Sequence, residues 1–122
     1  MASRIEQARE FQERTKRFAI RVIQAFPSLT RSEAARIIGR QLLRSGTAVA
    51  ANYRAACRAR SAADFISKIS IVTEETDETL FWLELLTDSK LIDANRLAPL
   101  INECSELLKI FSASLATAKS NR

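Results

Sequence analysis

The chain has 122 residues, of which 47% are hydrophobic, so it can bury one core without help from disulfides or metals. Its two glycines and two prolines supply too few turns for a β-sandwich, whereas a few long helices need only a few breaks. The N-terminus is polar and lacks an apolar run of signal-peptide or membrane-span length. We therefore expect one cytoplasmic, all-α domain over residues 1–122, without a membrane contact.

Charge is distributed unevenly along the chain, although the formal net charge is only +5. Residues 1–60 contain thirteen Lys and Arg against four Asp and Glu, which gives +9, and residues 61–122 contain six against ten, which gives −4. This asymmetry is compatible with a polyanionic partner for the basic half. It is equally compatible with self-association between the basic half of one subunit and the acidic half of another.

Hydrophobic patterns of period 3.6 predict four helices, and their short connections predict an antiparallel, up-down-up-down four-helix bundle. The first helix is expected from about Arg4 to Ala25, with Ser3 as its N-cap. Its core stripe is Phe11, Thr15, Phe18, Val22 and Ala25. The arginines of this helix lie near acidic residues on the same helix, which favours pairing within the helix. The residues concerned are Arg14, Arg17 and Arg21, with Glu6, Glu10 and Glu13.

The second helix is expected to begin at a capping box in residues 30–33, with Thr30 as the N-cap and Glu33 reaching back to it. It continues to about Arg60. Its core line is Ala34, Ile38, Leu42, Ser45, Val49, Asn52 and Ala56. On a helical wheel, five arginines lie opposite this line within an arc of about 80°. They are Arg36, Arg40, Arg44, Arg54 and Arg58, and we call them the arginine face.

Two interpretations of the arginine face are open. The first is that the face does not bind nucleic acid and is either solvated or paired with acidic residues of a neighbouring chain. The second is that it contacts nucleic acid. The second interpretation has a physical basis, because guanidinium groups pair bidentately with phosphates and a stripe of them can follow a nucleic-acid backbone.

The third helix is expected directly after a second N-cap at Ser61. Its core seam is Phe65, Ile69, Val72, Thr76, Thr79, Leu83 and Leu86. The helix is also apolar on a second side, which a monomeric bundle does not require, and we expect an oligomer interface there. This second face comprises Ile71, Glu74, Glu78, Phe81, Trp82 and Leu85. The alternative is that Phe81 and Trp82 rest on a flanking segment of their own chain.

The fourth helix follows a break in residues 88–93. Its core stripe is Leu97, Leu100, Ile101, Cys104, Leu108, Phe111 and Leu115. Proline fits only the first turn of a helix, so the regular part is expected to begin near Ala98, or a kink lies at Pro99. Cys57 and Cys104 lack the spacing of a zinc or redox motif and are expected to be reduced core thiols.

The sequence offers few residues for catalysis. It contains no histidine and no glycine-rich phosphate loop, so we expect neither an enzyme nor a cofactor. Carboxylate pairs occur at Glu75/Glu78 and Glu103/Glu106, but the Glu-x-x-His motifs of di-iron bundles are missing, and no metal site is expected. Arg44, Asn52 and Glu78 are candidates for a buried or interfacial polar network that specifies register.

Two segments carry a family resemblance. Residues 41–54 (QLLRSGTAVAANYR), with residues 58–61 (RARS) and 64–68 (DFISK), form the first, and residues 75–86 (ETDETLFWLELL) form the second. Together they resemble the bacterial four-helix-bundle family named for proteins encoded in 23S ribosomal-RNA intervening sequences. The resemblance implies an antiparallel bundle without enzymatic activity, often a ring-like homopentamer. A related branch contains accessory proteins of diversity-generating retroelements, which are basic and associate with nucleic acid and a reverse transcriptase.

The leading hypothesis from the sequence is a small homo-oligomeric adaptor that binds RNA or DNA phosphates through the arginine face with little sequence preference. The alternative is a structural or protein-interaction module without nucleic acid. In that alternative the same arginines pair across subunits with Glu74, Glu75 and Glu78.

Overall fold

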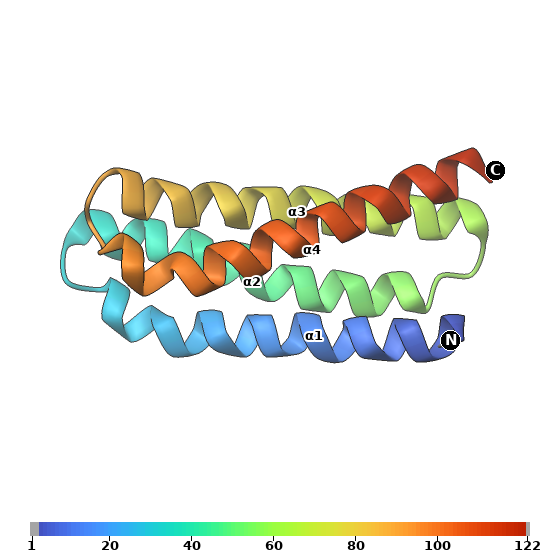
Figure 1. The fold of residues 1–122 in the computed structure, drawn as a ribbon, viewed down its shortest axis with the longest axis horizontal. Coiled ribbons are helices and arrows are strands. Elements are labelled where there is room, and N and C mark those ends of the chain that lie inside the picture. Colours follow the sequence, from blue (N-terminus) through green and yellow to red (C-terminus); the bar gives the residue numbers. More distant parts are fainter. Residues whose placement is uncertain (1–2, 122) are drawn as a thin grey trace.

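The computed structural model describes residues 3–121, which form four α-helices and one 3-10 turn (Figure 1). The elements are α1 (Arg4–Ala25), η1 (Phe26–Leu29), α2 (Glu33–Cys57), α3 (Ala62–Asp88) and α4 (Ala94–Ser120). The described residues contain no strand, so the expected all-α class is confirmed.

Two of the expected helix caps are present as the sequence indicates. The hydroxyl of Ser3 accepts a hydrogen bond from the Glu6 amide at 3.1 Å, and the hydroxyl of Ser61 accepts one from the Asp64 amide at 3.0 Å. Each satisfies one of the backbone N–H groups that the first turn of a helix leaves without a partner. These caps explain why α1 and α3 begin where they do.

The start of α2 differs from the expected one. Its N-cap is Ser32, whose hydroxyl accepts from the Ala35 amide at 3.1 Å, and the helix begins at Glu33. Thr30 instead donates to the Pro27 carbonyl at 2.8 Å, because the chain is still in the 3-10 turn up to Leu29. The predicted capping box at Thr30 is therefore wrong by two residues. At its other end α2 stops at Cys57, three residues before the expected Arg60.

The start of α4 also differs. The Asp93 carboxylate accepts from the Asn95 amide at 3.2 Å, and the helix runs from Ala94 straight through Pro99. The expectation that the regular helix begins near Ala98 is wrong. Proline lacks an N–H, so the Asn95 carbonyl loses its partner within the helix. Both residues are exposed, and water can hydrogen-bond this carbonyl in place of the missing amide.

The four helices pack as an antiparallel, up-down-up-down bundle, as predicted. Helix α2 packs against both α1 and α3, and α3 packs against α4, whereas α1 and α4 make a much smaller contact. Figure 1 shows α4 crossing the bundle obliquely, so that its C-terminal half leaves the side of α1. Both ends of the chain lie at the end of the bundle where α2 connects to α3.

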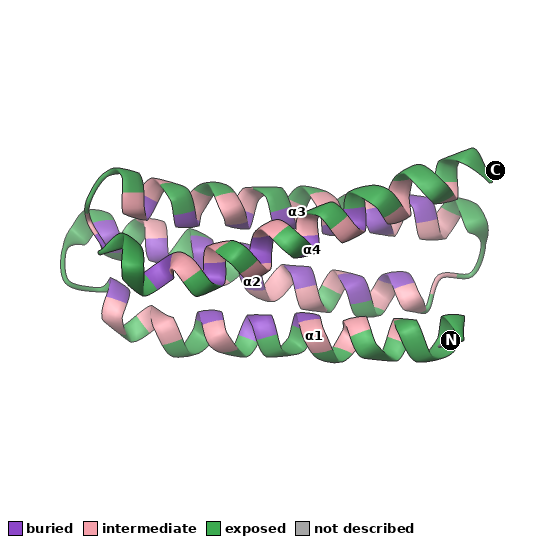
Figure 2. Cartoon of the chain, viewed as in Figure 1, coloured by how far each residue is buried: buried purple, intermediate pink, exposed green. Residues whose placement is uncertain are grey.

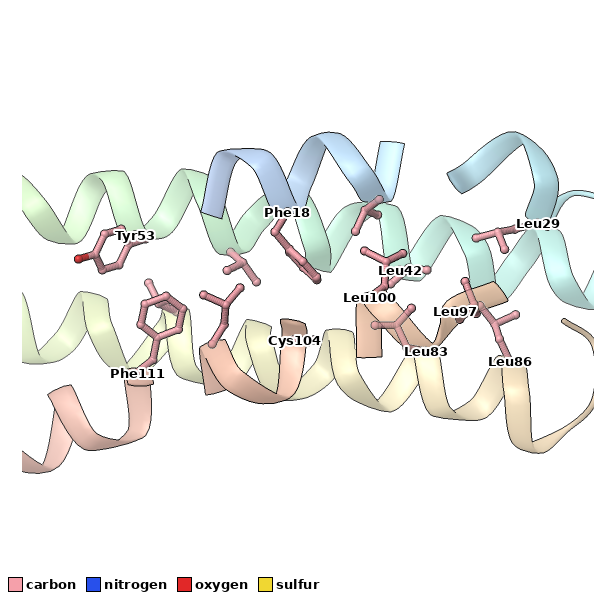
Figure 3. Packing of buried hydrophobic residues seen from close by; sticks show 14 of the residues in the cluster. Phe18, Leu29, Leu42, Tyr53, Leu83, Leu86, Leu97, Leu100, Cys104 and Phe111 are labelled. Carbon is pink, nitrogen blue, oxygen red and sulfur yellow. The ribbon is translucent and has the colours of Figure 1, made fainter. Parts of the chain in front are cut away.

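One core runs the length of the bundle and receives residues from all four helices (Figure 3). Its largest fully buried side chains include Phe18, Leu42, Leu83 and Phe111. The buried side of each helix faces its neighbours, and the exposed side faces outward (Figure 2).

Two expected core positions are wrong by one residue. Ala34 is exposed and Ala35 is buried, and Leu108 is only half-buried whereas Leu107 is fully buried. In both cases the neighbouring residue also fits a period of 3.6, and the direction of the adjacent helix decides which of the two faces the core.

Small residues let α1 and α2 approach closely. A Cβ atom on Gly46 would lie 3.1 Å from Cγ2 of Val22, which is fully buried. A glycine inside a helix costs about 1 kcal/mol relative to alanine. At Gly46 this cost is offset by the close contact with α1 that the missing side chain permits.

Both cysteines are free thiols, as expected, but only Cys104 is buried in the core, whereas Cys57 is half-buried. Cys104 is buried and donates to the Thr76 carbonyl at 3.3 Å, and burial raises its pKa to about 12. A thiol with so high a pKa is protonated at neutral pH and is a poor nucleophile.

Candidate nucleic-acid and oligomer interfaces

The arginine face lies on the outer side of α2, where all five of its side chains are exposed. It extends from Arg36 to Arg58, the C-cap of α2, a separation of 22 residues that in an α-helix corresponds to about 33 Å. This face is opposite the buried line of Leu42 and Val49. The structure therefore brings the five residues to one surface, as the helical wheel predicts.

Four of the five arginines have no acidic partner among residues 3–121. The cations of the ion pairs in this part of the chain are Arg14, Arg44 and Lys68. The unpaired members are Arg36, Arg40, Arg54 and Arg58. An exposed, unpaired guanidinium keeps all five of its N–H donors available for an external anion.

Arg44 differs from the other four, because α3 holds its guanidinium. Its Nη2 donates to Oε1 of Glu78, and its Nη1 lies 3.6 Å from Oε2 of Glu75. The hydrogen bond that Arg44 donates to Glu78 is the largest cause of the raised pKa of Arg44. Arg44 therefore connects α2 to α3 and has fewer donors left for a ligand than its four neighbours.

The predicted polar network is present in part. Glu78 accepts from Arg44 and also from Nε1 of Trp82, at 3.2 Å. Asn52 does not join them, since its amide donates to the Ala48 carbonyl of its own helix at 2.9 Å. Asn52 lies eight residues further along α2 than Arg44, about 12 Å away along the helix axis, so the two side chains do not meet.

The predicted interface residues of α3 form an exposed apolar area on its outer side. Phe81 is 54% exposed and Ile71 is 42% exposed, whereas Trp82 and Leu85 are half-buried. The rings of Phe81 and Trp82 meet edge to face with their centroids 5.1 Å apart. Glu74 is exposed beside them. We call Ile71, Phe81, Trp82 and Leu85 the aromatic face.

Sequence reasoning missed one exposed apolar residue on α2, the helix that packs against α3. Ile37 on α2 is 54% exposed. The hydroxyl oxygens of Ser45 and Thr79 lie 2.9 Å apart and set the antiparallel register of α2 and α3. Ile37 is eight residues before Ser45 and Leu85 is six after Thr79, so both lie on the same side of this bond, about 12 and 9 Å from it along their helices. The sequence does contain a signal for Ile37, because it is a large apolar residue that lies outside the core line of its helix.

The arginine row of α1 pairs with another helix. Arg14 donates to Glu103 at 2.7 and 2.9 Å and to Glu106 at 3.1 Å, both on α4. No ion pair among residues 3–121 joins two residues of α1, so the expected pairing with Glu6, Glu10 and Glu13 is wrong. The hydrogen bond from Arg14 holds the pKa of Glu103 below its ordinary value.

The remaining chemistry of the described chain is sparse. Among residues 3–121, no three His, Cys, Asp or Glu side chains are placed to hold a metal ion. In the same part of the chain, no helix has the length and apolar character needed to cross a bilayer.

These features define a small four-helix-bundle protein whose distinctive surfaces are an arginine face and an aromatic face. The chain belongs to the family of 23S rRNA-intervening sequence proteins, whose pattern matches residues 7–113. This match confirms the resemblance seen in the sequence.

A solved structure supports the same assignment. It is a protein of unknown function from the S23 ribosomal protein family of Bacteroides thetaiotaomicron VPI-5482. It is 33% identical to the chain, with a TM-score of 0.78, and the match covers 85% of this chain and 96% of that one. No curated protein has a significant match to the sequence. Nothing in these relatives points to catalysis.

Proposed function

We propose that the protein is a non-enzymatic, homo-oligomeric accessory protein that binds the phosphate backbone of RNA or DNA through the arginine face. The observation that carries the proposal is the set of four exposed arginines on α2 and at its C-cap that have no acidic partner among residues 3–121. On a helix, an exposed arginine can be stabilised by an acidic residue three or four positions away. These four arginines form no such pair in the described part of the chain, which leaves them available to an external anion. Phosphate contacts of this kind carry little sequence information.

The proposal predicts a steep salt dependence of binding. Affinity for a single-stranded RNA should fall linearly with the logarithm of salt concentration, with a slope of about 0.7 per phosphate contact. The double variant Arg36→Glu/Arg40→Glu should weaken binding and reduce the slope by about 1.4, since it removes two contacts. Fluorescence anisotropy at salt concentrations from about 50 to about 300 mM measures both the affinity and the slope.

The matched control is Arg9→Glu/Arg96→Glu. Arg9 on α1 and Arg96 on α4 are also exposed and unpaired among residues 3–121, and the double variant changes the net charge equally. It should keep most of the wild-type slope. Failure of the wild-type oligomer to bind at low salt, or equal losses in the two double variants, would refute the arginine face as the binding surface.

A second candidate function is a protein-interaction module, and the exposed aromatic face favours it. A monomer has no need for a phenylalanine that is 54% exposed beside a tryptophan. In this alternative the arginines would pair with acidic residues of a neighbouring subunit. Glu75 and Glu78 already hold Arg44 of their own chain, so Glu74 is the exposed acid of the three. Salt-sensitive assembly without any affinity for RNA or DNA would favour this alternative.

A further inference from the structure

A hollow of about 630 Å³ lies at the connection between α2 and α3. Its lining consists of four cationic side chains, one carboxylate and two alanines. They are Arg54, Arg58, Arg60 and Lys68, Asp64, and Ala51 and Ala55. The hollow includes one end of the arginine face and adds two cations, Arg60 and Lys68, that the face does not contain.

The only carboxylate of the lining is already neutralised. The ammonium group of Lys68 donates to both oxygens of Asp64, at 2.9 and 2.7 Å, and the Arg60 amide donates to one of them at 3.1 Å. These contacts, with the Lys68 bond as the largest cause, lower the pKa of Asp64, so it is ionised at neutral pH. Asp64 and Lys68 thus cancel, and the remaining charge of the hollow comes from its three arginines.

Arg54, Arg58 and Arg60 take part in no ion pair among the described residues. Ala51 and Ala55 contribute only methyl groups to the lining, which leaves room between the guanidinium groups. Three guanidinium groups around one hollow offer more donors than a phosphodiester can use with its two free oxygens. They match a phosphate monoester, which has three terminal oxygens and up to two negative charges.

The helix dipole does not explain this cluster alone. Partial negative charge at the C-terminus of a helix favours a cation in its last turn, which accounts for Arg54 or Arg58. Arg60 lies beyond the helix, in the connection to α3. The dipole also gives no reason for a hollow whose lining includes two alanines as well as the cations.

We propose that this hollow binds the terminal phosphate monoester of an RNA or DNA strand, while the rest of the arginine face contacts the phosphodiesters that follow. The inference rests on the proposed function, because it places a strand on α2. It adds a preference for strand ends, which a straight stripe of arginines would not have.

The test compares two versions of one single strand, labelled internally, with either phosphates or hydroxyls at both ends. Wild-type protein should bind the phosphorylated strand about tenfold more tightly, as expected for one or two additional charge-assisted hydrogen bonds. Arg60→Gln should reduce this preference to about twofold or less and leave affinity for the hydroxyl strand nearly unchanged, since Arg60 is outside the arginine face. Ala55→Leu, which fills the hollow without changing charge, should have the same effect.

The matched control is Arg31→Gln, which removes the same charge. Arg31 is exposed, precedes α2 and is far from the hollow in the chain. It should keep the full preference. Arg36→Glu/Arg40→Glu should lower the affinity for both strands and leave the ratio of the two affinities unchanged.

Each other outcome decides against the inference in a distinct way. Equal affinities of wild-type protein for the two strands would overturn the terminal-phosphate site and leave the proposed function intact. No binding of either strand would overturn both. A competition experiment adds free inorganic phosphate or an unlabelled phosphorylated strand. If the two competitors abolish the preference at the same concentration, the hollow is a small-anion site and its assignment to strand ends is wrong.

Discussion

Two buried hydroxyl groups connect α2 and α3 at the centre of the bundle. Ser45 and Thr79 are completely buried, and their oxygens lie 2.9 Å apart. The Thr79 hydroxyl also lies 2.7 Å from the Glu75 carbonyl, and that of Ser45 lies 3.4 Å from the Leu42 carbonyl. Buried polar groups must find partners, so this pair favours one register of the two helices over slipped alternatives.

Replacing only one of the two hydroxyls should be more harmful than replacing both. Thr79→Val keeps the shape of the side chain but leaves Ser45 with only the long contact to Leu42, and should lower the free energy of unfolding by about 1–2 kcal/mol. Thr79→Val combined with Ser45→Ala removes the unsatisfied group and should recover part of that loss. Urea unfolding of the wild type, both single variants and the double variant measures the coupling. Strict additivity would show that the pair has no energetic role.

At the same residue scale, the sequence indicates which side of a helix a residue lies on but not which residue it meets. The arginine face was predictable from one helix alone, because the position of its members depends only on a turn of 3.6 residues. That Arg44 is paired whereas Arg40 is free depends on the register of α2 against α3, which no local pattern contains. Asn52 was misassigned for the same reason.

Among the neighbouring helices, α1 and α4 are the least closely packed, and Arg14 on α1 pairs with Glu103 and Glu106 on α4. The side chains of Arg14 and Glu103 are mostly buried, with relative exposures of 24% and 18%, whereas that of Glu106 is 68% exposed. A bidentate, partly desolvated pair of this kind is stronger than an exposed one. Glu103 therefore contributes more to holding α1 against α4 than Glu106 does.

This pair should give stability a specific pH dependence. The folded-state pKa of Glu103 is depressed, so its contribution is fully present above its unfolded pKa and is lost as pH falls through the folded value. Glu103→Gln should destabilise the protein by about 1 kcal/mol at pH 7, and this difference from wild type should disappear in acid. Urea unfolding at several pH values from neutral to strongly acidic would measure it.

The control for this prediction is Glu106→Gln, which changes the charge equally on the same helix. Since Glu106 is largely exposed, its replacement should have a smaller effect at pH 7. A stability difference between wild type and Glu103→Gln that is constant with pH would contradict the assignment of the effect to the ionised carboxylate.

At the scale of elements, the sequence predicted the number, order and approximate bounds of the helices. Ser3 and Ser61 are caps that precede uninterrupted apolar periodicity, and their positions could be read directly. The start of α2 could not, because Thr30 and Ser32 are both good N-caps and the 3-10 turn before them decides between the two. Pro99 misled the prediction of where the last helix begins. Proline removes only one hydrogen bond of the helix, whereas Leu97 and Leu100 on either side of it are buried in the core and hold the helix in place.

At the scale of the whole molecule, the two halves of the chain form two differently charged sides. The basic half contains α1 and α2, and the acidic half contains α3 and α4. Four ion pairs cross between these halves, and two arginines make them. Arg14 pairs with Glu103 and Glu106, and Arg44 pairs with Glu75 and Glu78. The charge asymmetry read from the sequence thus serves partly to hold the monomer together. The arginines other than Arg14 and Arg44 are the ones available to a partner.

The aromatic face is where we expect a second copy of the chain to bind, and Phe81 is the residue that tests it most cleanly. Trp82 packs partly against the core and donates to Glu78, so its replacement would also disturb the fold. Phe81 is 54% exposed, and Phe81→Glu should leave stability nearly unchanged while placing a charge in an apolar contact.

The wild type should therefore have a native mass that is a multiple of 13.7 kDa, and Phe81→Glu should have the mass of one chain. Ile23→Glu is the matched control, because Ile23 on α1 is 51% exposed and lies outside the aromatic face, and this variant should remain assembled. Light scattering measures all three masses. A wild type of one chain would show that the exposed aromatic residues do not drive self-association. A Phe81→Glu variant that stays assembled would move the interface to another surface. If assembly is lost only in Phe81→Glu, the arginine faces of several subunits act together, and the affinity of the oligomer for a strand should exceed that of the variant because several subunits can hold one strand at once.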